Sequence, residues 1–186
     1  MSQGMSASHI PVLTLIPKYF HITKVLEIGS GGMSTPLFLN KNIYPDLQEL
    51  VSVEEDVEWL NKTNKLYSKN EKLTLLTSTP ASLYHYDLIF VDGPQSAIKR
   101  AKVIHYVMRE LIKPLIVVHD IENRLYKKQI NKEYNEYLFN FIKSPMTGIY
   151  SREEIPVKTF IKFDKLMYKY FDEFQEDAEK WEGLFK

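Results

Sequence analysis

The sequence lacks cysteine altogether, which excludes disulfide bonds, thiolate metal ligands and a cysteine nucleophile. No apolar run is long enough to cross a bilayer, so no membrane association is expected. The formal net charge is zero, whereas proteins that bind a nucleic-acid backbone usually carry a basic excess. The N-terminus lacks the basic start and apolar middle of a signal peptide. We therefore expect a disordered leader over residues 1–8, a cytoplasmic location and no nucleic-acid partner.

Glycine is also scarce, yet Gly29, Gly31 and Gly32 lie close together. They follow a short apolar run, VLEI, that is typical of a buried parallel strand, and they precede an apolar stretch that predicts the first turns of a helix. Strand, glycine-rich turn and helix form the geometry in which backbone can approach a ligand closely, because no Cβ blocks the way. A turn of this kind also occurs as a plain connection, so it needs support from the rest of the chain.

Alternating apolar runs and helical patterns predict one α/β domain over residues 9–186, with a doubly wound, mostly parallel sheet. The expected parallel strands cover 24–28, 50–54, 72–76, 86–92 and 115–118. The expected helices cover 9–20, 35–40, 57–67, 96–111 and 123–142.

The last part of the chain predicts an antiparallel closure of the sheet. Two β-rich runs, 146–150 and 157–163, are expected to form this strand pair. From residue 165 onward, aromatic and apolar side chains recur every three or four residues, which predicts an amphipathic C-terminal helix. This helix either packs on its own domain or forms a homodimer interface.

Polar residues follow the apolar strands of the predicted sheet. In a doubly wound sheet, ligands bind beyond the carboxyl ends of the strands, so these residues are expected to meet on one rim. They are Ser30 to Thr35, Glu54, Glu55, Ser78, Thr79, Asp92, His119 and Asp120.

Glu54 ends the second predicted strand, about 20 residues after the glycine turn, where a carboxylate can hold a ribose diol. The alternative is a surface acid at the start of a helix, a role that Asp56 fits better as an N-cap. The turn reads G-x-G-G-M rather than G-x-G-x-x-G, and Glu27 directly before it would repel a pyrophosphate. A cofactor without phosphates is therefore favoured over a dinucleotide.

Four motifs in this order resemble those of class I S-adenosylmethionine (SAM)-dependent methyltransferases: EIGSGGMST, SVEEDVEW, YDLIFVDGP with Arg100 downstream, and IVVHD. The VDGP and HD pairing is also similar to the plant glucuronoxylan methyltransferase group. The resemblance covers about residues 25–120. It implies a Rossmann-like fold, S-adenosyl-L-methionine as the cofactor, and methyl transfer to oxygen or nitrogen of an unidentified acceptor.

The resemblance also implies roles for individual residues. Gly29, Ser30 and Gly31 would line the methionine part of the cofactor, Glu27 would order the loop from beneath, and Glu54 would hold the ribose hydroxyls. Asp92 would face the sulfonium and the substrate. The other cofactor-binding candidates, which would complete the loop or border the adenine, are Gly32, Ser34, Thr35, Glu55, Ser78 and Thr79.

The catalytic candidates are Asp92, His119 and Asp120, at the ends of the fourth and fifth predicted strands. In catechol-type O-methyltransferases, acids at the places of Asp92 and Asp120 hold a divalent cation, so this pair is a candidate metal site, although a site without metal is favoured. His119 is either a general base or a structural histidine. Arg100 is expected to be a solvated helix residue, with anionic-substrate binding as the alternative.

Two other functions remain open at the level of the sequence. One is a nucleotide-binding oxidoreductase, and the other is a non-enzymatic protein with a degenerate cofactor site. A chain of this length has little room for a separate recognition domain. The expected acceptor is therefore a small molecule or an exposed sugar or peptide end.

Overall fold

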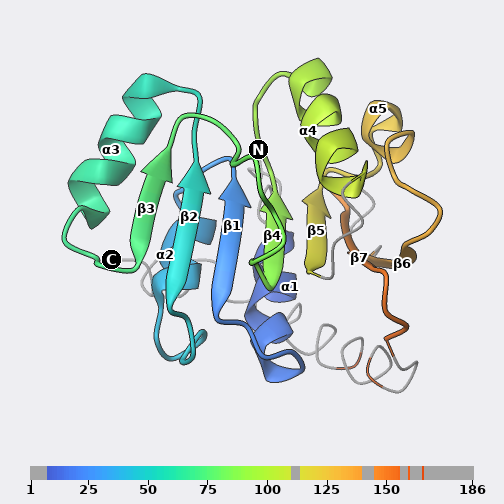
Figure 1. The fold of residues 1–186 in the computed structure, drawn as a ribbon, viewed down its shortest axis with the longest axis horizontal. Helices are drawn as coiled ribbons and strands as arrows, with labels where there is room; N and C mark the ends of the chain where they lie inside the picture. The colour runs from blue at the N-terminus through green and yellow to red at the C-terminus, as the bar shows by residue number, and fades with distance from the viewer. Residues whose placement is uncertain (1–7, 110–113, 140–144, 156–158, 160–164, 166–186) are drawn as a thin grey trace, which may run out of the picture.

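The computed structural model describes residues 8–109, 114–139, 145–155, 159 and 165. Within these residues, seven strands form one sheet in the order β3-β2-β1-β4-β5-β7-β6, which Figure 1 shows from left to right. The strands are β1 (Lys24–Ile28), β2 (Glu49–Val53), β3 (Leu73–Leu76), β4 (Leu88–Val91), β5 (Leu115–His119), β6 (Asn135–Phe139) and β7 (Thr147–Ser151). The helices are α1 (His9–Leu15), the 3-10 helix η1 (Ile16–Lys18), α2 (Ser34–Leu39), α3 (Val57–Tyr67), α4 (Ala97–Arg109) and α5 (Arg124–Lys127).

The central parallel strands β1, β2, β4 and β5 are buried on both faces, which explains why most of their residues are apolar. Successive side chains alternate between the faces. Val25 and Leu50 pack with α1 and α2, whereas Leu26 and Val51 lie on the face covered by α4 and α5 (Figure 1). The predicted fold class, a doubly wound and mostly parallel sheet with an antiparallel pair near the C-terminus, is confirmed.

The predicted helix over 123–142 is wrong. Over the described part of this range, 123–139, the one helix is the short α5, and β6 follows it and pairs antiparallel with β7. Tyr137 and Phe139 pack on one part of the core and Leu138 between them packs on the other, so pairing with β7 outweighs the local preference for helix. The antiparallel pair is therefore β6 and β7 rather than 146–150 and 157–163. Apart from residues 159 and 165, the predicted strand 157–163 and the C-terminal helix lie outside the described residues.

The sheet order places a crevice where a ligand is expected. β1 pairs with β2 on one side and with β4 on the other, so the chain winds in opposite directions from this point. Ligands of doubly wound sheets bind at such a switch point, beyond the carboxyl ends of the strands. The loops that follow β1, β2, β4 and β5 all reach this rim.

Among the helices that the structure describes, none is long and apolar enough to span a membrane.

Candidate functional site

The backbone turns sharply directly after β1. Gly29 has a φ of +97°, and its N–H donates to the Val53 carbonyl at 2.9 Å. A Cβ on Gly29 would lie 2.5 Å from the Gly93 nitrogen, and a Cβ on Gly93 would lie 2.5 Å from the Gly29 Cα. The two glycines therefore let the loops after β1 and β4 pack backbone against backbone. Sequence reasoning treated Gly93 only as a strand end, although it stands inside the VDGP motif.

A buried carboxylate anchors this loop from beneath. Glu27 of β1 accepts hydrogen bonds from Ser34 Oγ at 2.6 Å, Thr35 Oγ1 at 2.7 Å and Ser52 Oγ at 2.6 Å. Thr35 Oγ1 in turn accepts the Gly31 N–H at 3.1 Å. These side chains point below the loop, so the geometry favours positioning roles for Ser34 and Thr35 over direct contact with a cofactor.

Glu27 is fully buried in the middle of the sheet. Burial raises the pKa of Glu27 to about 7, although its hydrogen bonds from Ser34, Ser52 and Thr35 act in the opposite direction. The negative charge of Asp92 adds to the upward shift. Proton binding at Glu27 is therefore coupled to the stability of the fold near neutral pH.

Above the loop lies an open cleft of about 310 Å³ at the carboxyl ends of β1, β2 and β4. Glu54 lies in its wall, where its Oε2 accepts Ser30 Oγ at 3.3 Å and its Oε1 accepts the Asp56 N–H at 2.9 Å. These contacts hold the carboxylate beside the glycine turn. The cleft is lined by Gly29, Ser30, Gly31, Glu54, Asp56, Trp59, Asp92, Gly93, Pro94 and Gln95.

Trp59 forms another wall of the cleft. Its indole N–H donates to the Ser30 carbonyl at 2.6 Å and fixes α3 to the glycine loop. Asp56 begins α3 as the predicted N-cap, since its Oδ1 accepts the Trp59 backbone N–H at 2.9 Å. Sequence reasoning gave Trp59 no site role, although the SVEEDVEW motif contains it.

A second, smaller hollow adjoins the cleft and shares Gly29, Glu54 and Pro94 with it. The hollow is lined by Ser78, Thr79 and Glu55, which the sequence analysis expects on the same rim. The Glu55 carboxylate pairs with Lys99 Nζ at 2.5 Å on the surface. Gly32 lies exposed at the outer end of the turn and lines neither hollow.

Arg100 is not a solvated helix residue, because only 5% of it is exposed. Its Nη1 donates to Asp92 Oδ1 at 3.2 Å and to Asp120 Oδ2 at 2.9 Å, and its Nε donates to the Pro94 carbonyl at 3.1 Å. A guanidinium cation therefore bridges the two carboxylates that were the candidate metal pair. This arrangement gives Asp92 and Asp120 one shared cationic partner.

Asp120 and His119 follow each other at the end of β5 but lie in different surroundings. Asp120 adopts a φ of +58°, a left-handed conformation that aspartate tolerates better than most residues. His119 is buried, and its Nδ1 lies 3.2 Å from Thr147 Oγ1 of β7. Asp92 lies between this histidine and the cleft. Burial raises the pKa of Asp92, while His119 and Arg100 oppose that shift.

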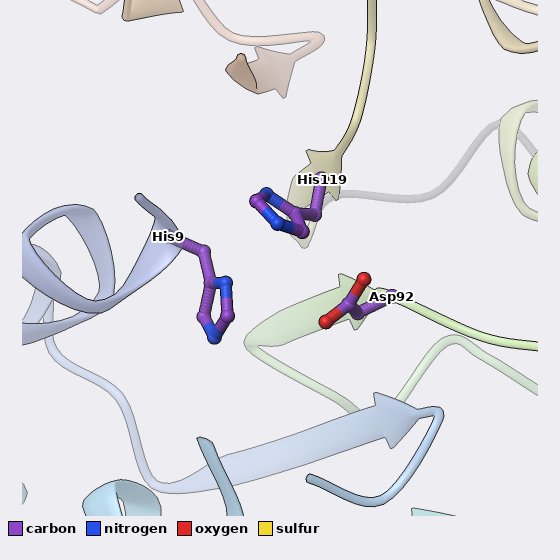
Figure 2. Close-up of side chains that lie close together, drawn as sticks. All are labelled: His9, Asp92 and His119. Carbon is purple, nitrogen blue, oxygen red and sulfur yellow. The ribbon is translucent and has the colours of Figure 1, made fainter. Parts of the chain in front are cut away.

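Sequence reasoning missed His9 as a member of this region. His9 is the first residue of α1, and Figure 2 shows its ring facing Asp92 and His119. The His9 and His119 ring centroids are 4.6 Å apart. No local pattern marks His9, because its neighbours come from strands that follow much later in the chain.

A scan against known protein families and a search of curated proteins found no match. Solved structures do match the fold. An O-methyltransferase from Bacillus cereus in complex with SAH has a TM-score of 0.59 at 12% identity, covering 81% of this chain and 84% of the other. TomG from Streptomyces achromogenes, an O-methyltransferase involved in tomaymycin synthesis and solved with SAM, has a TM-score of 0.56 at 14% identity, covering 78% and 80%.

A third solved structure, the precorrin-6y C5,15-methyltransferase of Geobacter metallireducens, has a TM-score of 0.57 at 14% identity. The match covers 81% of this chain and 93% of that protein. At sequence identities this low, a structural match is evidence about the fold alone. The chain thus has the Rossmann-like fold seen in SAM-dependent methyltransferases.

Proposed function

We propose that this chain is a SAM-dependent methyltransferase and that its cofactor occupies the cleft above the glycine turn. The observation that carries the proposal is the position of Glu54. Its carboxylate shares one cleft with the bare backbone of Gly29 and Gly31, which is the pairing that an adenosyl ligand without phosphates requires. The fold and the order of the sequence motifs support the same function.

The residues that line the cleft fit such a cofactor. Each Glu54 oxygen accepts one hydrogen bond in the structure and keeps capacity for a ribose hydroxyl. Backbone at Gly29 and Gly31 would contact the methionine part, where no side chain intervenes. The hollow beside Ser78 and Thr79 measures about 20 Å³, so an adenine ring there requires this segment and Pro94 to move apart.

The bound cofactor supplies a methyl group on a positively charged sulfur, which an acceptor displaces in line. Asp92 directs negative charge into the cleft, where it favours the sulfonium and orients the acceptor. Arg100 holds Asp92 in place from beneath. Trp59 fixes the Ser30 backbone and narrows the entrance beside Glu54.

The acceptor that we propose is a small molecule or an exposed sugar or peptide end. The cleft opens to solvent beside Trp59 and Gln95, so such a group could reach Asp92. The similarity of the VDGP and HD motifs to glucuronoxylan methyltransferases favours a hydroxyl acceptor on a sugar. This finer assignment stays a prediction.

Thermal unfolding with four ligands tests the proposal: SAM, S-adenosylhomocysteine (SAH), NAD and NADP. SAM and SAH should each raise the Tm, and a hundredfold excess over the Kd adds about 2.7 kcal/mol of stability. A shift with NAD or NADP alone would support the oxidoreductase alternative instead. If none of the four ligands moves the Tm, the cleft is not a cofactor site and the proposal fails.

A further inference from the structure

Three metal-ligating side chains converge on the α1 side of the sheet, next to the cleft but outside its lining except for Asp92. They are His9 from the start of α1, Asp92 after β4 and His119 at the end of β5 (Figure 2). One ligand atom from each lies within 4.8 Å of those of the other two. Strand alternation produces this cluster, since Phe90 and Val117 share the face that α1 covers, and Asp92 and His119 come two residues after them.

His9 carries the strongest sign of a ligand. Only 5% of His9 is exposed, and its Nδ1 is the buried side-chain polar atom for which the described part of the chain provides no hydrogen-bond partner. Most buried polar atoms in folded proteins have a hydrogen-bond partner, so this one favours a ligand that the described residues do not supply. Figure 2 shows this nitrogen, the one bonded to Cγ, directed toward Asp92 and His119.

We propose that His9, Asp92 and His119 bind a first-row transition-metal dication, such as Zn²⁺ or Fe²⁺. Two imidazoles and one carboxylate suit these ions, and such three-ligand sites leave positions open for water or substrate. Mg²⁺ and Ca²⁺ prefer shells made of oxygen atoms, so two histidines disfavour them.

The neighbours of the cluster are arranged as supports for metal ligands. Thr147 Oγ1 lies 3.2 Å from His119 Nδ1 and orients this ring, whose Nε2 lies 3.7 Å from Asp120 Oδ1. Arg100 engages Asp92 through Oδ1, so Oδ2 remains for a metal. Asp92 and Asp120 together carry two negative charges against the single positive charge of Arg100. A dication would therefore enter a region with an excess of negative charge.

The distances allow the three side chains to close around an ion. Metal bonds to histidine nitrogen and carboxylate oxygen measure about 2.0–2.2 Å. Three ligand atoms at most 4.8 Å apart all lie within ~2.8 Å of a common point, so inward shifts below about 1 Å complete the shell. Side-chain rotations of this size do not require the strands to move.

Metal binding stands independently of the proposed function, but a catalytic use of the metal rests on it. Asp92 belongs both to this cluster and to the lining of the cleft. A metal here would lie beside the expected acceptor and lower the pKa of a coordinated hydroxyl, which helps that hydroxyl to lose its proton.

Titration of the untagged, EDTA-stripped protein with Co²⁺ tests the inference, because Co²⁺ on nitrogen and oxygen ligands gives visible d–d bands. We expect one equivalent to saturate these bands and Zn²⁺ to abolish them by displacement. His9→Gln should weaken Co²⁺ binding by more than the ~10–100-fold that loss of a supporting residue costs, and Thr147→Val by about tenfold. His105→Gln, at an exposed histidine of α4, is the matched control and should bind as the wild type does.

Two results would overturn the inference: wild-type protein that gives no saturable Co²⁺ bands, or a His9→Gln variant that folds by circular dichroism and binds Co²⁺ as tightly as the wild type. Should His9→Gln not fold, anomalous diffraction from wild-type crystals soaked in Zn²⁺ decides. A peak among His9, Asp92 and His119 supports the site, and a peak elsewhere or none contradicts it. SAH binding, measured separately by calorimetry, reports on the proposed function, so either idea can fail alone.

Discussion

Glu27 shows at the scale of a single residue how the glycine loop is held. Its carboxylate is fully buried and accepts three hydroxyl hydrogen bonds, two of them from the first residues of α2. Through Thr35, the same network reaches the Gly31 N–H. The acid that precedes the turn thus acts on the loop by positioning it rather than by contact with a ligand.

The raised pKa of Glu27 makes stability depend on pH in a defined direction. In the folded protein the pKa of Glu27 is about 7, above its ordinary value of 4.5, so the folded state holds this proton more tightly than the unfolded state. The Glu27 contribution is therefore complete below pH 4.5 and is lost as the pH rises through 7. The loss amounts to about 3 kcal/mol, taking ~1.4 kcal/mol for each pKa unit.

Urea unfolding of wild type and Glu27→Gln at several pH values measures this contribution. The free energy of unfolding of the wild type, relative to that of the variant, should fall by about 3 kcal/mol between acidic pH and about pH 8, because Gln does not titrate. Glu58→Gln, at an exposed acid of α3, should instead follow the wild-type profile. A Glu27→Gln profile parallel to the wild type would show that the native pKa of Glu27 is not raised.

Arg100 gives a second prediction at the scale of the residue. Arg100→Met leaves the carboxylates of Asp92 and Asp120 close together without their shared cation. Loss of one partner from a buried ion pair costs about 3–5 kcal/mol, and the partial exposure of both acids reduces this to about 2 kcal/mol. Lys99→Met removes the exposed pair with Glu55 and should cost less than about 1 kcal/mol. If Arg100→Met and Lys99→Met lowered the free energy of unfolding in urea equally, the bridging role of Arg100 would be contradicted.

Two loops pack without side chains between them at the scale of the elements. Gly29 after β1 and Gly93 after β4 approach so closely that a Cβ on either would overlap the backbone of the other. We expect Gly93→Ala to destabilise the protein by at least about 2 kcal/mol, because the loops must separate. Gly29→Ala adds the strain of a positive φ.

Gly32→Ala is the matched control for these glycine variants. A Cβ there would meet only the Trp59 ring, at 3.8 Å, which is ordinary contact. Its stability should stay within about 0.5 kcal/mol of the wild type in urea unfolding. If Gly93→Ala proved equally harmless, the close approach of the two loops would not exist in solution.

The elements differ in how well the sequence predicts them. β1 has its predicted bounds because it is a short apolar run flanked by polar residues and glycine. The segment 123–142 misled prediction, because its many Lys, Glu and Asn residues resemble a polar helix. Its strand β6 is a half-exposed sheet edge whose pairing partner comes later in the chain. Such an edge is specified by tertiary contact with β7 rather than by local pattern.

The residues of the candidate site also divide into those that the sequence predicts and those that only tertiary contacts specify. Polar residues after β1, β2 and β4 could be placed on one rim, since topology alone brings strand ends together. Arg100 could not, because helical periodicity puts it among the polar residues of α4 while its partners lie at the ends of two strands. His9 is likewise joined to His119 only by the packing of α1 on the sheet.

At the scale of the whole molecule, the order of the strands determines where chemistry can occur. The switch between β1 and β4 leaves a crevice whose walls come from the loops after β1, β2 and β4 and from the first turn of α3. The described part of the fold matches methyltransferases from several bacteria at 12–14% identity, so the arrangement persists while most side chains differ. The side chains at the crevice therefore carry the functional account, with Glu54 at its centre.

Calorimetric titration with SAH tests the central claim most directly. The wild type should bind one equivalent, and Glu54→Gln should raise the Kd by about ten- to a hundredfold, because hydrogen bonds to a charged group are worth about 1.5–3 kcal/mol. Glu58→Gln, at an exposed acid of the adjoining helix α3, should bind as the wild type does. A wild type that does not bind SAH, or a folded Glu54→Gln variant that binds it with unchanged Kd, would contradict the account.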